Sequence, residues 1–195
     1  MSVSAIIMAA GSSIRMNQDK LKMKIKEKCI YQYIFEKINS SKCFNEVIVV
    51  AKDHDILKKS IEMGFKTVLN DKSYLGQSQS IRLGILNLSD AEGYMFFTAD
   101  QPFISEETIK ELVNTFEKNP NNITVPCYNG ICGSPAIFPA IYKNQLLKLS
   151  GDTGGKIIIK DNEDKLIRVN IQSKDELIDI DTMEDYRRVC VEEGD

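Results

Sequence analysis

A short segment near the start of the chain has residue types that suit phosphate binding. Ala9-Ala10-Gly11-Ser12-Ser13 are small residues at the end of an apolar run. Small side chains let a ligand approach the backbone, where exposed N–H groups can bind phosphate oxygens or a base edge. Arg15 and Lys20 follow, adding a guanidinium that can bind two oxygens and an ammonium. The segment predicts a triphosphate site, and a surface turn with solvated basic residues is the alternative.

Asp100 is the first carboxylate whose position suggests chemistry. It closely follows an apolar run at 94–98 and precedes Pro102. Mg²⁺ prefers hard oxygen ligands and commonly takes one or two protein carboxylates, with substrate phosphates and water completing its shell. We therefore expect Asp100 to bind Mg²⁺, while a turn-forming or helix-capping aspartate is the alternative.

Asp179 and Asp181 alternate with apolar residues near the end of the chain. If this segment is a strand, both carboxylates face the same side. Either could then supply a second metal ligand. Alternatively, Asp181 or Thr182 could be the N-cap of a final helix.

The elements that must position these side chains alternate along the chain. Apolar, β-branched runs predict strands at 4–9, 47–51, 94–98 and 123–125. Helical spacing of apolar residues predicts helices at 31–39, 56–62, 80–88 and 106–118. Further strands are expected at 131–138 and 166–171, and a closing helix at 182–191. This alternation predicts a mostly parallel sheet covered on both faces, with its ligand beyond the carboxyl ends of the strands.

Length and composition are those of one folded domain. The chain has 195 residues, of which 43% are hydrophobic and 27% charged, with a net charge of −3. This predicts a single domain over residues 1–195 that folds without covalent cross-links. The five cysteines form no C-x-x-C pair, which favours a reducing, cytoplasmic location over a disulfide or zinc framework. The single histidine, His54, excludes a histidine-based metal site or catalytic triad.

Several other protein classes are disfavoured. No segment approaches the roughly 20 apolar residues of a membrane span, and the apolar run at 3–10 is interpreted as a buried strand rather than a signal peptide. The chain has no G-x-G, and the segment 151–157 departs from a P-loop in spacing and at Ile157. The alternating lysines from Lys20 to Lys28 could suggest nucleic-acid binding. However, the net charge of the chain is negative, and no aromatic residues alternate with these lysines. Only Lys20 is assigned to chemistry, and the other lysines are expected on a solvated face.

Six segments, taken in order, carry a family resemblance. They are Met8-Ala9-Ala10-Gly11-Ser12-Ser13-Ile14-Arg15-Met16 with Lys20-Leu21, 76–84, 99–104, 133–139, 151–155 and 179–186. Together they resemble the signatures of MobA-like nucleotidyltransferases of the molybdenum cofactor type. Ala9-Ala10-Gly11 and Ser80 are more similar to the cytidylyltransferases than to the guanylyltransferases, which tend to have a second glycine in the first loop. Asn17, Ala99 and Ser134 depart from the usual pattern, and Ser134 stands where a histidine is common near the acceptor.

The resemblance implies a fold and a reaction. The fold is an α/β, Rossmann-like three-layer sandwich with a mostly parallel central sheet, of the nucleotide-diphospho-sugar transferase type. The reaction is transfer of CMP from CTP to the terminal phosphate of a molybdopterin-type cofactor, with release of pyrophosphate. Because a phosphate monoester is already largely ionised at neutral pH, this chemistry needs no general base.

The resemblance also implies a role for each candidate residue. Catalysis would rest on Arg15, Lys20 and Asp100, and Mg²⁺ would be held by Asp100 and Asp179. Nucleotide binding would involve Ala9, Ala10, Gly11, Ser12, Ser13, Arg15, Lys20 and Ser80. Cys127, Tyr128, Cys132 and Ser134 are candidates for the acceptor pocket or for ordinary packing.

Three alternatives to CMP transfer remain open. Guanylyl transfer to the same cofactor, or nucleotidyl transfer to another phosphate acceptor, would use the same machinery. A non-catalytic nucleotide-binding chaperone could instead hand the cofactor to a target enzyme such as a molybdenum hydroxylase. Such a chaperone would bind nucleotide without Mg²⁺-dependent turnover. Neither a nucleic acid nor a membrane is expected as a partner.

Overall fold

The structure is a computed structural model that describes residues 2–11, 16 and 18–192. An eight-stranded sheet forms its centre, with the strand order β10-β7-β9-β6-β1-β4-β5 and β8 paired to β7. Its strands are β1 (Val3–Ala9), β4 (Val47–Ala51), β5 (Lys66–Leu69), β6 (Gly93–Thr98), β7 (Ile123–Tyr128), β8 (Ile131–Cys132), β9 (Ala136–Pro139) and β10 (Leu166–Asn170). β1 is parallel to both β4 and β6, whereas β9 runs antiparallel to β6 and β7.

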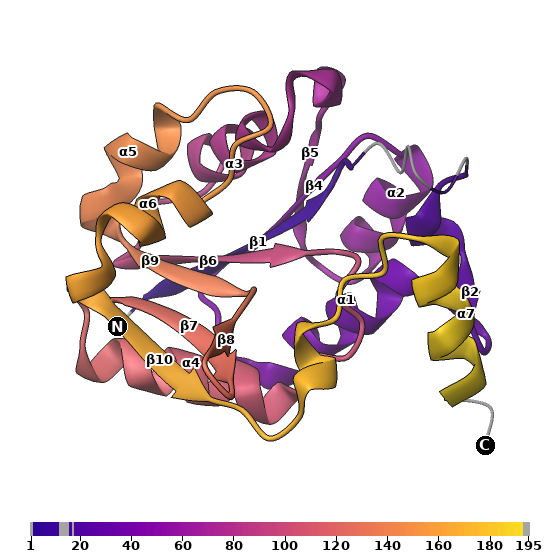
Figure 1. The fold of residues 1–195 in the computed structure, drawn as a ribbon. Helices are drawn as coiled ribbons and strands as arrows, with labels where there is room; N and C mark the ends of the chain where they lie inside the picture. Colours follow the sequence, from indigo (N-terminus) through magenta and orange to yellow (C-terminus); the bar gives the residue numbers. More distant parts are fainter. Residues whose placement is uncertain (1, 12–15, 17, 193–195) are drawn as a thin grey trace.

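Helices cover both faces of the sheet (Figure 1). They are α1 (Ile30–Ser41), α2 (His54–Glu62), α3 (Gln77–Leu86), α4 (Glu106–Lys118), α5 (Lys143–Leu147), α6 (Lys156–Asp161) and α7 (Met183–Glu192). Successive side chains of a strand point to opposite faces. Accordingly, Ala5 and Ile7 of β1 belong to a core with α1 and α4, and Ile6 belongs to a core with α3, α5 and α6. The predicted three-layer α/β sandwich is confirmed.

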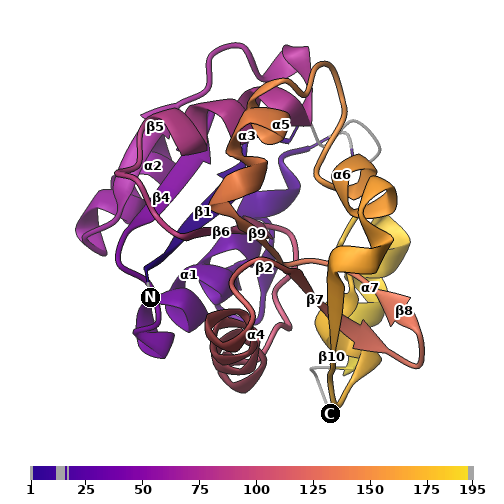
Figure 2. The same ribbon diagram turned by 90° about the vertical axis from the view of Figure 1, so that its left-hand side faces the viewer.

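The helix layer of α3 packs tightly on the central strand. A Cβ built on Gly84 would lie 2.5 Å from Cγ2 of Ile6, so α3 can approach β1 closely only because residue 84 is glycine. Figure 2 shows α3 beside β1 from a second direction. This packing brings the first turn of α3 toward the carboxyl ends of the strands.

The predicted strands and helices of the first half are present, with bounds that differ by a few residues. Helix α4 has the predicted bounds, and Ser105 caps it by accepting a 3.0 Å hydrogen bond from the Thr108 N–H. Helix α3 begins at Gln77 rather than at residue 80.

One expectation for local structure was wrong, and one open alternative was decided. Residues 131–138 form two strands, because Gly133, Ser134 and Pro135 interrupt the run and proline has no N–H for the sheet ladder. The segment around Asp179 is not a strand. The lysines after Lys20 are exposed, as expected. They lie along the 3₁₀ helix η2 (Lys20–Lys22) and the small antiparallel pair β2 (Lys24–Ile25) and β3 (Lys28–Cys29).

The expectation that the cysteines are thiols was wrong for one pair. Cys127 on β7 lies opposite Cys132 on β8, with Cα atoms 4.0 Å apart, and a disulfide joins them. Antiparallel pairing across a tight hairpin brings the two side chains together, which the spacing in sequence did not reveal. Cys29, Cys43 and Cys190 are free thiols. Within the described part of the chain, no helix is long and apolar enough to cross a membrane.

Candidate functional site

A cleft of about 1190 Å³ lies at the carboxyl edge of the central strands. Ala10 and Gly11 line it after β1, and Ala99 and Asp100 line it after β6. The first turn of α3 and the segments 132–134, 151–157 and 179–181 contribute the remaining polar wall. The cleft therefore collects residues from both halves of the chain at the edge where an open α/β sheet binds its ligand.

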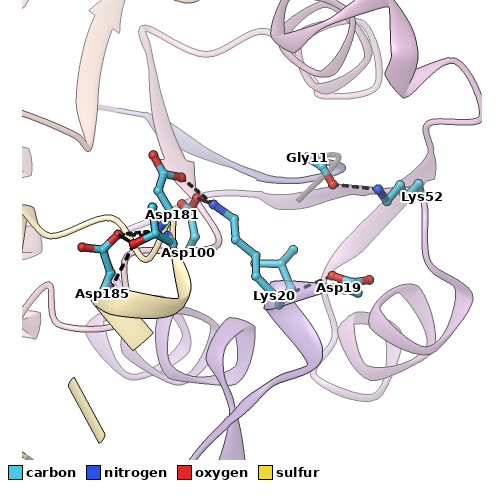
Figure 3. Close-up of polar contacts among 9 residues, drawn as sticks. Gly11, Asp19, Lys20, Lys52, Asp100, Asp181 and Asp185 are labelled. Atoms are coloured by element: carbon cyan, nitrogen blue, oxygen red, sulfur yellow. Dashed lines mark hydrogen bonds and ion pairs between the residues drawn. The ribbon is translucent and has the colours of Figure 1, made fainter. Parts of the chain in front are cut away.

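Lys20 is at the centre of the polar contacts in this cleft (Figure 3). Its Nζ donates to Oδ2 of Asp100 at 2.6 Å and to Oδ1 of Asp181 at 2.8 Å. Lys20 is only 8% exposed. Burial by itself would lower the pKa of the ammonium, but the charges and hydrogen bonds of Asp100 and Asp181 outweigh burial and raise that pKa. Lys20 is thus a charged, buried cation held between two carboxylates.

Backbone contacts position these three side chains. Lys20 begins η2, whose cap is Asp19, a side chain that accepts the Leu21 N–H at 3.2 Å. The Ala99 N–H donates to the Met8 carbonyl at 3.1 Å, which ties the loop of Asp100 to β1. The Ile180 N–H donates to the Asp100 carbonyl at 3.1 Å, which brings residues 179–181 to the same edge.

The N-cap of α7 is Thr182, one of the two candidates. Its Oγ1 accepts the Asp185 N–H at 3.1 Å, and Oδ2 of Asp185 accepts the Thr182 N–H at 2.9 Å. This reciprocal pair is a capping box with aspartate at the third helical position. The cap is provided by Thr182, and the Asp181 carboxylate is directed toward Lys20 instead (Figure 3).

Lys52 supports the first loop, a contact that the sequence reasoning missed. It directly follows β4, and its Nζ donates to the Gly11 carbonyl at 2.7 Å (Figure 3). The rule that ligands bind beyond the carboxyl ends of the strands could have identified Lys52 as a candidate. Ser12, Ser13 and Arg15 lie outside the described residues.

Ser80 lines the cleft from the first turns of α3. Its Oγ accepts a 3.0 Å hydrogen bond from Nδ2 of Asn70, a fully buried residue that follows β5. A hydroxyl has one donor and two acceptor positions. Because Asn70 uses one acceptor position, this contact leaves the Ser80 proton for donation to another group.

The start of α3 is joined to the glycine-rich segment across the cleft. Oγ of Ser78 donates to the Gly151 carbonyl at 2.7 Å, and the Gln77 N–H donates to Oδ1 of Asp152 at 3.2 Å. Gly76 has φ +93°, and a Cβ there would lie 2.4 Å from the Gly151 backbone. The two segments therefore depend on glycine at position 76 for their close contact.

The far wall of the cleft carries the residues considered for the acceptor. Cys132 and Ser134 line it, whereas Cys127 is buried in the core beneath. Lys156, at the first position of α6, also lines the cleft, where its charge slightly offsets the rise in the pKa of Asp179 that burial causes. Lys156 is a second residue that the sequence reasoning did not assign.

The family follows from a comparison of the whole chain with family models. Residues 5–166 match the model of the MobA-like NTP transferase domain. The chain belongs to this family. The matched range contains the loops of Lys20 and Asp100 and the cleft wall at Lys156, and it ends before Asp179 and Asp181.

The chain is also similar to individual relatives, and its fold is similar to that of solved structures. Over 130 residues the chain is 32% identical to a probable molybdenum cofactor guanylyltransferase of Natranaerobius thermophilus, covering 66% of this chain and 62% of that protein. It is 26% identical to the purine catabolism protein PucB of Bacillus subtilis, covering 94% of each chain. The fold matches Rv0371c of Mycobacterium tuberculosis H37Rv with a TM-score of 0.83 and 18% identity over 98% of each chain. Rv0371c has also been solved in complex with manganese, with a TM-score of 0.79, 18% identity and coverage of 98% of this chain and 99% of that one.

The MobA-like domain has carboxylates that suit a divalent cation shared with a substrate. Oδ1 of Asp100 is buried and has no hydrogen-bond partner. Asp179 faces the cleft, where desolvation and then the charges of Asp100 and Asp181 raise its pKa to about 6. In the described ranges, no three histidine, cysteine or acidic side chains are arranged to hold a metal by themselves. This donor set fits a hard cation that takes one or two carboxylates and completes its shell with phosphates and water.

Proposed function

We propose that this MobA-like domain transfers a nucleoside monophosphate from a nucleoside triphosphate to a phosphate group of an acceptor. The observation that carries the proposal is the meeting of Lys20, Asp100 and Asp181, within 2.8 Å, next to the small-residue loop at Gly11. A cation and a metal-binding carboxylate beside exposed backbone suit the binding of a polyanion together with a divalent cation. Membership of the MobA-like family supports the same reaction.

The proposed step is an in-line displacement at phosphorus. A phosphate oxygen of the acceptor forms a bond to the α-phosphorus, and the bond from that phosphorus to the oxygen bridging to the β-phosphate breaks, so that pyrophosphate leaves. The acceptor phosphate is already ionised near neutral pH, so no proton has to be removed. The work of the protein is then to position two anions and to stabilise the charge on the leaving group. Lys20 and Arg15 are proposed to do this at the triphosphate.

Asp100, with Asp179 or Asp181, would hold Mg²⁺, which supplies positive charge to the phosphates when it is bound. The unpartnered Oδ1 of Asp100 supports this assignment, because a buried carboxylate oxygen gains most from a ligand that satisfies it. The manganese complex of Rv0371c supports a divalent cation on the same fold. Asp179 is the second ligand that the resemblance favours; desolvation and then the charges of Asp100 and Asp181 raise its pKa, and a bound cation would relieve the part due to charge. Asp181 is the other candidate, because its carboxylate and that of Asp100 already share one cation, the Lys20 ammonium.

The nucleotide is proposed to be CTP, with GTP as the second candidate. Ala9-Ala10-Gly11 favours CTP through the resemblance to cytidylyltransferases, whereas the name of the Natranaerobius relative favours GTP. The contact of Asn70 with Ser80 favours neither, since cytosine and guanine both offer an acceptor to the Ser80 proton.

The acceptor is proposed to be a molybdopterin-type phosphate monoester, as the resemblance and the name of the same relative suggest. Lys156 and Ser134 also line the cleft and can bind the acceptor's phosphate. A molybdenum hydroxylase is the proposed recipient of the product.

A nucleotide panel tests the proposed function. Pyrophosphate release is measured with CTP, GTP or ATP, with Mg²⁺, and with or without purified molybdopterin cofactor. We expect release that requires both Mg²⁺ and the acceptor and is fastest with CTP. Fastest release with GTP would move the assignment to guanylyl transfer. Binding of nucleotide and cofactor without any turnover would favour the chaperone and contradict the enzymatic proposal.

A further inference from the structure

The Lys20 ammonium lies between two carboxylates that could bind a cation. Its Nζ is within 2.6 Å of Oδ2 of Asp100 and within 2.8 Å of Oδ1 of Asp181. The side chain is 10% exposed and that of Asp100 is 17% exposed, so the pair is largely shielded from water. In the structure, therefore, the ammonium occupies the space between two of the carboxylates that could bind a metal.

The charge balance of the cleft explains why a cation is needed there. Among the described residues that line the cleft, four are acidic and two are basic: Asp100, Asp152, Asp179 and Asp181 against Lys20 and Lys156. The carboxylates of Asp100 and Asp181 carry like charges close together, and burial followed by these two charges raises the pKa of Asp179. The Asp181 side chain is 43% exposed, but that of Asp100 is 17% exposed, so without a cation the charge of Asp100 would be poorly compensated.

An ammonium and a divalent cation cannot share that space. At separations of 2.6 Å and 2.8 Å the ammonium uses the near oxygens of both carboxylates, and two positive charges this close would repel strongly. Entry of a divalent cation at Asp100 and Asp181 therefore requires the Lys20 ammonium to leave. Lys20 has a flexible four-carbon stem, so the ammonium can move without movement of the backbone.

We propose that Lys20 is a place-holder for the divalent cation. The inference rests on the proposed function for the presence of that cation and takes Asp181, beside Asp100, as its second ligand. In the metal-free protein the ammonium keeps Asp100 and Asp181 together. When the cation binds, the ammonium leaves the carboxylates and binds the phosphates of the nucleotide. A cation alone binds weakly because it must displace Lys20, and cation and nucleotide then favour each other's binding.

The chain contains a matched control for this proposal. Lys22 also bridges two carboxylates, with Nζ 2.6 Å from Oδ2 of Asp53 and 2.7 Å from Oδ2 of Asp55. Its side chain is 38% exposed, and Lys22 is not among the residues that line the cleft. Lys20 and Lys22 thus share charge and pairing, but only Lys20 lies at the proposed metal site.

The first experiment measures binding of Mn²⁺ alone by electron paramagnetic resonance, without nucleotide, for the parent, Lys20→Met and Lys22→Met. Methionine keeps an unbranched side chain of similar length without the charge. We expect Lys20→Met to bind one Mn²⁺ about 10-fold more tightly than the parent, within the usual range of coupling between two ligands. Lys22→Met is expected to match the parent at this site. Equal or weaker Mn²⁺ binding by folded Lys20→Met would overturn the proposal.

A second experiment uses the parent protein, so it does not depend on the folding of a variant. Lysine amines are labelled briefly with acetic anhydride, with and without saturating Mn²⁺, and the modified positions are read by mass spectrometry. Labelling of Lys20 is expected to rise severalfold with Mn²⁺, because its ammonium leaves the two carboxylates. Labelling of Lys22 is expected to stay constant. If Mn²⁺ left the labelling of Lys20 unchanged, the proposed exchange of the ammonium for the cation would be wrong.

The two proposals fail in different ways. If the parent releases pyrophosphate but Lys20 fails both tests, the transferase function stands and the place-holder role is wrong. If Lys20 passes both tests but no nucleotide and acceptor give turnover, the exchange stands and the proposed reaction is wrong.

Discussion

Lys20 and Asp100 form a hydrogen bond of 2.6 Å although 80 positions separate them in the sequence. The reason lies in the sheet: β1 and β6 are parallel neighbours, with Met8 opposite Thr98 at their carboxyl ends. The loops that follow the two strands leave the same edge, so a cation from the first loop meets an acid from the second. This relationship brings the proposed phosphate-binding and metal-binding groups into one cleft.

Loss of either partner is expected to reduce turnover strongly. Lys20→Ala removes positive charge that stabilises the leaving pyrophosphate. The rate is expected to fall about 10²–10³-fold, as in enzymes from which one hydrogen-bond donor to a developing negative charge is removed. Asp100→Ala is expected to weaken Mg²⁺-dependent turnover most. Pyrophosphate release at saturating nucleotide and Mg²⁺ measures both effects. Turnover at the parent rate in folded Asp100→Ala would refute its assignment as a metal ligand.

Asp179 is expected to make the metal-free protein less stable as the pH rises. Its folded-state pKa of about 6 is above its ordinary value of 3.8, so the folded protein holds this proton more tightly than the unfolded chain. The stabilising effect of the protonated form is therefore lost between about pH 4 and pH 7, as the pH rises through the folded pKa.

The variant Asp179→Asn tests the direction of this change in stability with pH. Its free energy of unfolding in urea with EDTA is expected to exceed that of the parent by about 1 kcal/mol at pH 8, a value reduced for the access of solvent to this group. The difference is expected to be much smaller near pH 4. Mg²⁺ is expected to shrink it at pH 8, because a bound cation favours the carboxylate. If the difference in free energy of unfolding between the variant and the parent did not change with pH, the raised pKa of Asp179 would be contradicted.

Gly76 is expected to be intolerant of any side chain. Its φ of +93° and the 2.4 Å approach to Gly151 combine strain with a backbone clash. Gly76→Ala is expected to lower the free energy of unfolding by more than about 2 kcal/mol. The matched control is Gly130→Ala, where φ is +82° and nothing lies within 4 Å, so only about 1 kcal/mol of strain is expected. If urea unfolding showed equal losses of free energy for the two variants, the close contact between the segments of Gly76 and Gly151 would be contradicted.

Lys156 is expected to contribute to binding of the acceptor. Lys156→Met is expected to raise the KM for the acceptor by about 10-fold, the effect of one charge-assisted hydrogen bond, and to leave the KM for the nucleotide unchanged. Lys160→Met is the control, because Lys160 lies exposed on the same helix and is not among the cleft residues. A rise in the nucleotide KM alone would assign Lys156 to the other substrate.

Local patterns in the sequence predicted the layers and the side of the sheet where chemistry occurs. Alternation and helical spacing are properties of neighbouring residues, so β1, β4, β6 and α4 were predictable. The alternation at residues 179–181 left a strand or a helix cap open. In the structure this segment is not a strand: the Ile180 N–H binds the Asp100 carbonyl, and Thr182 caps the helix that follows. The exposure of the lysines after Lys20 was predictable, whereas their division between η2 and a hairpin was not.

The sequence by itself determined that small residues, Lys20 and Asp100 follow parallel strands, and so that they lie at one edge. Only the tertiary structure decided that Lys20 is held by Asp181 as well as Asp100, and that Lys52 supports Gly11. It also decided that Cys127 pairs with Cys132. These contacts depend on distances of a few ångströms between segments far apart in the chain or across a hairpin, which the packing of the layers sets and no local pattern of residues encodes.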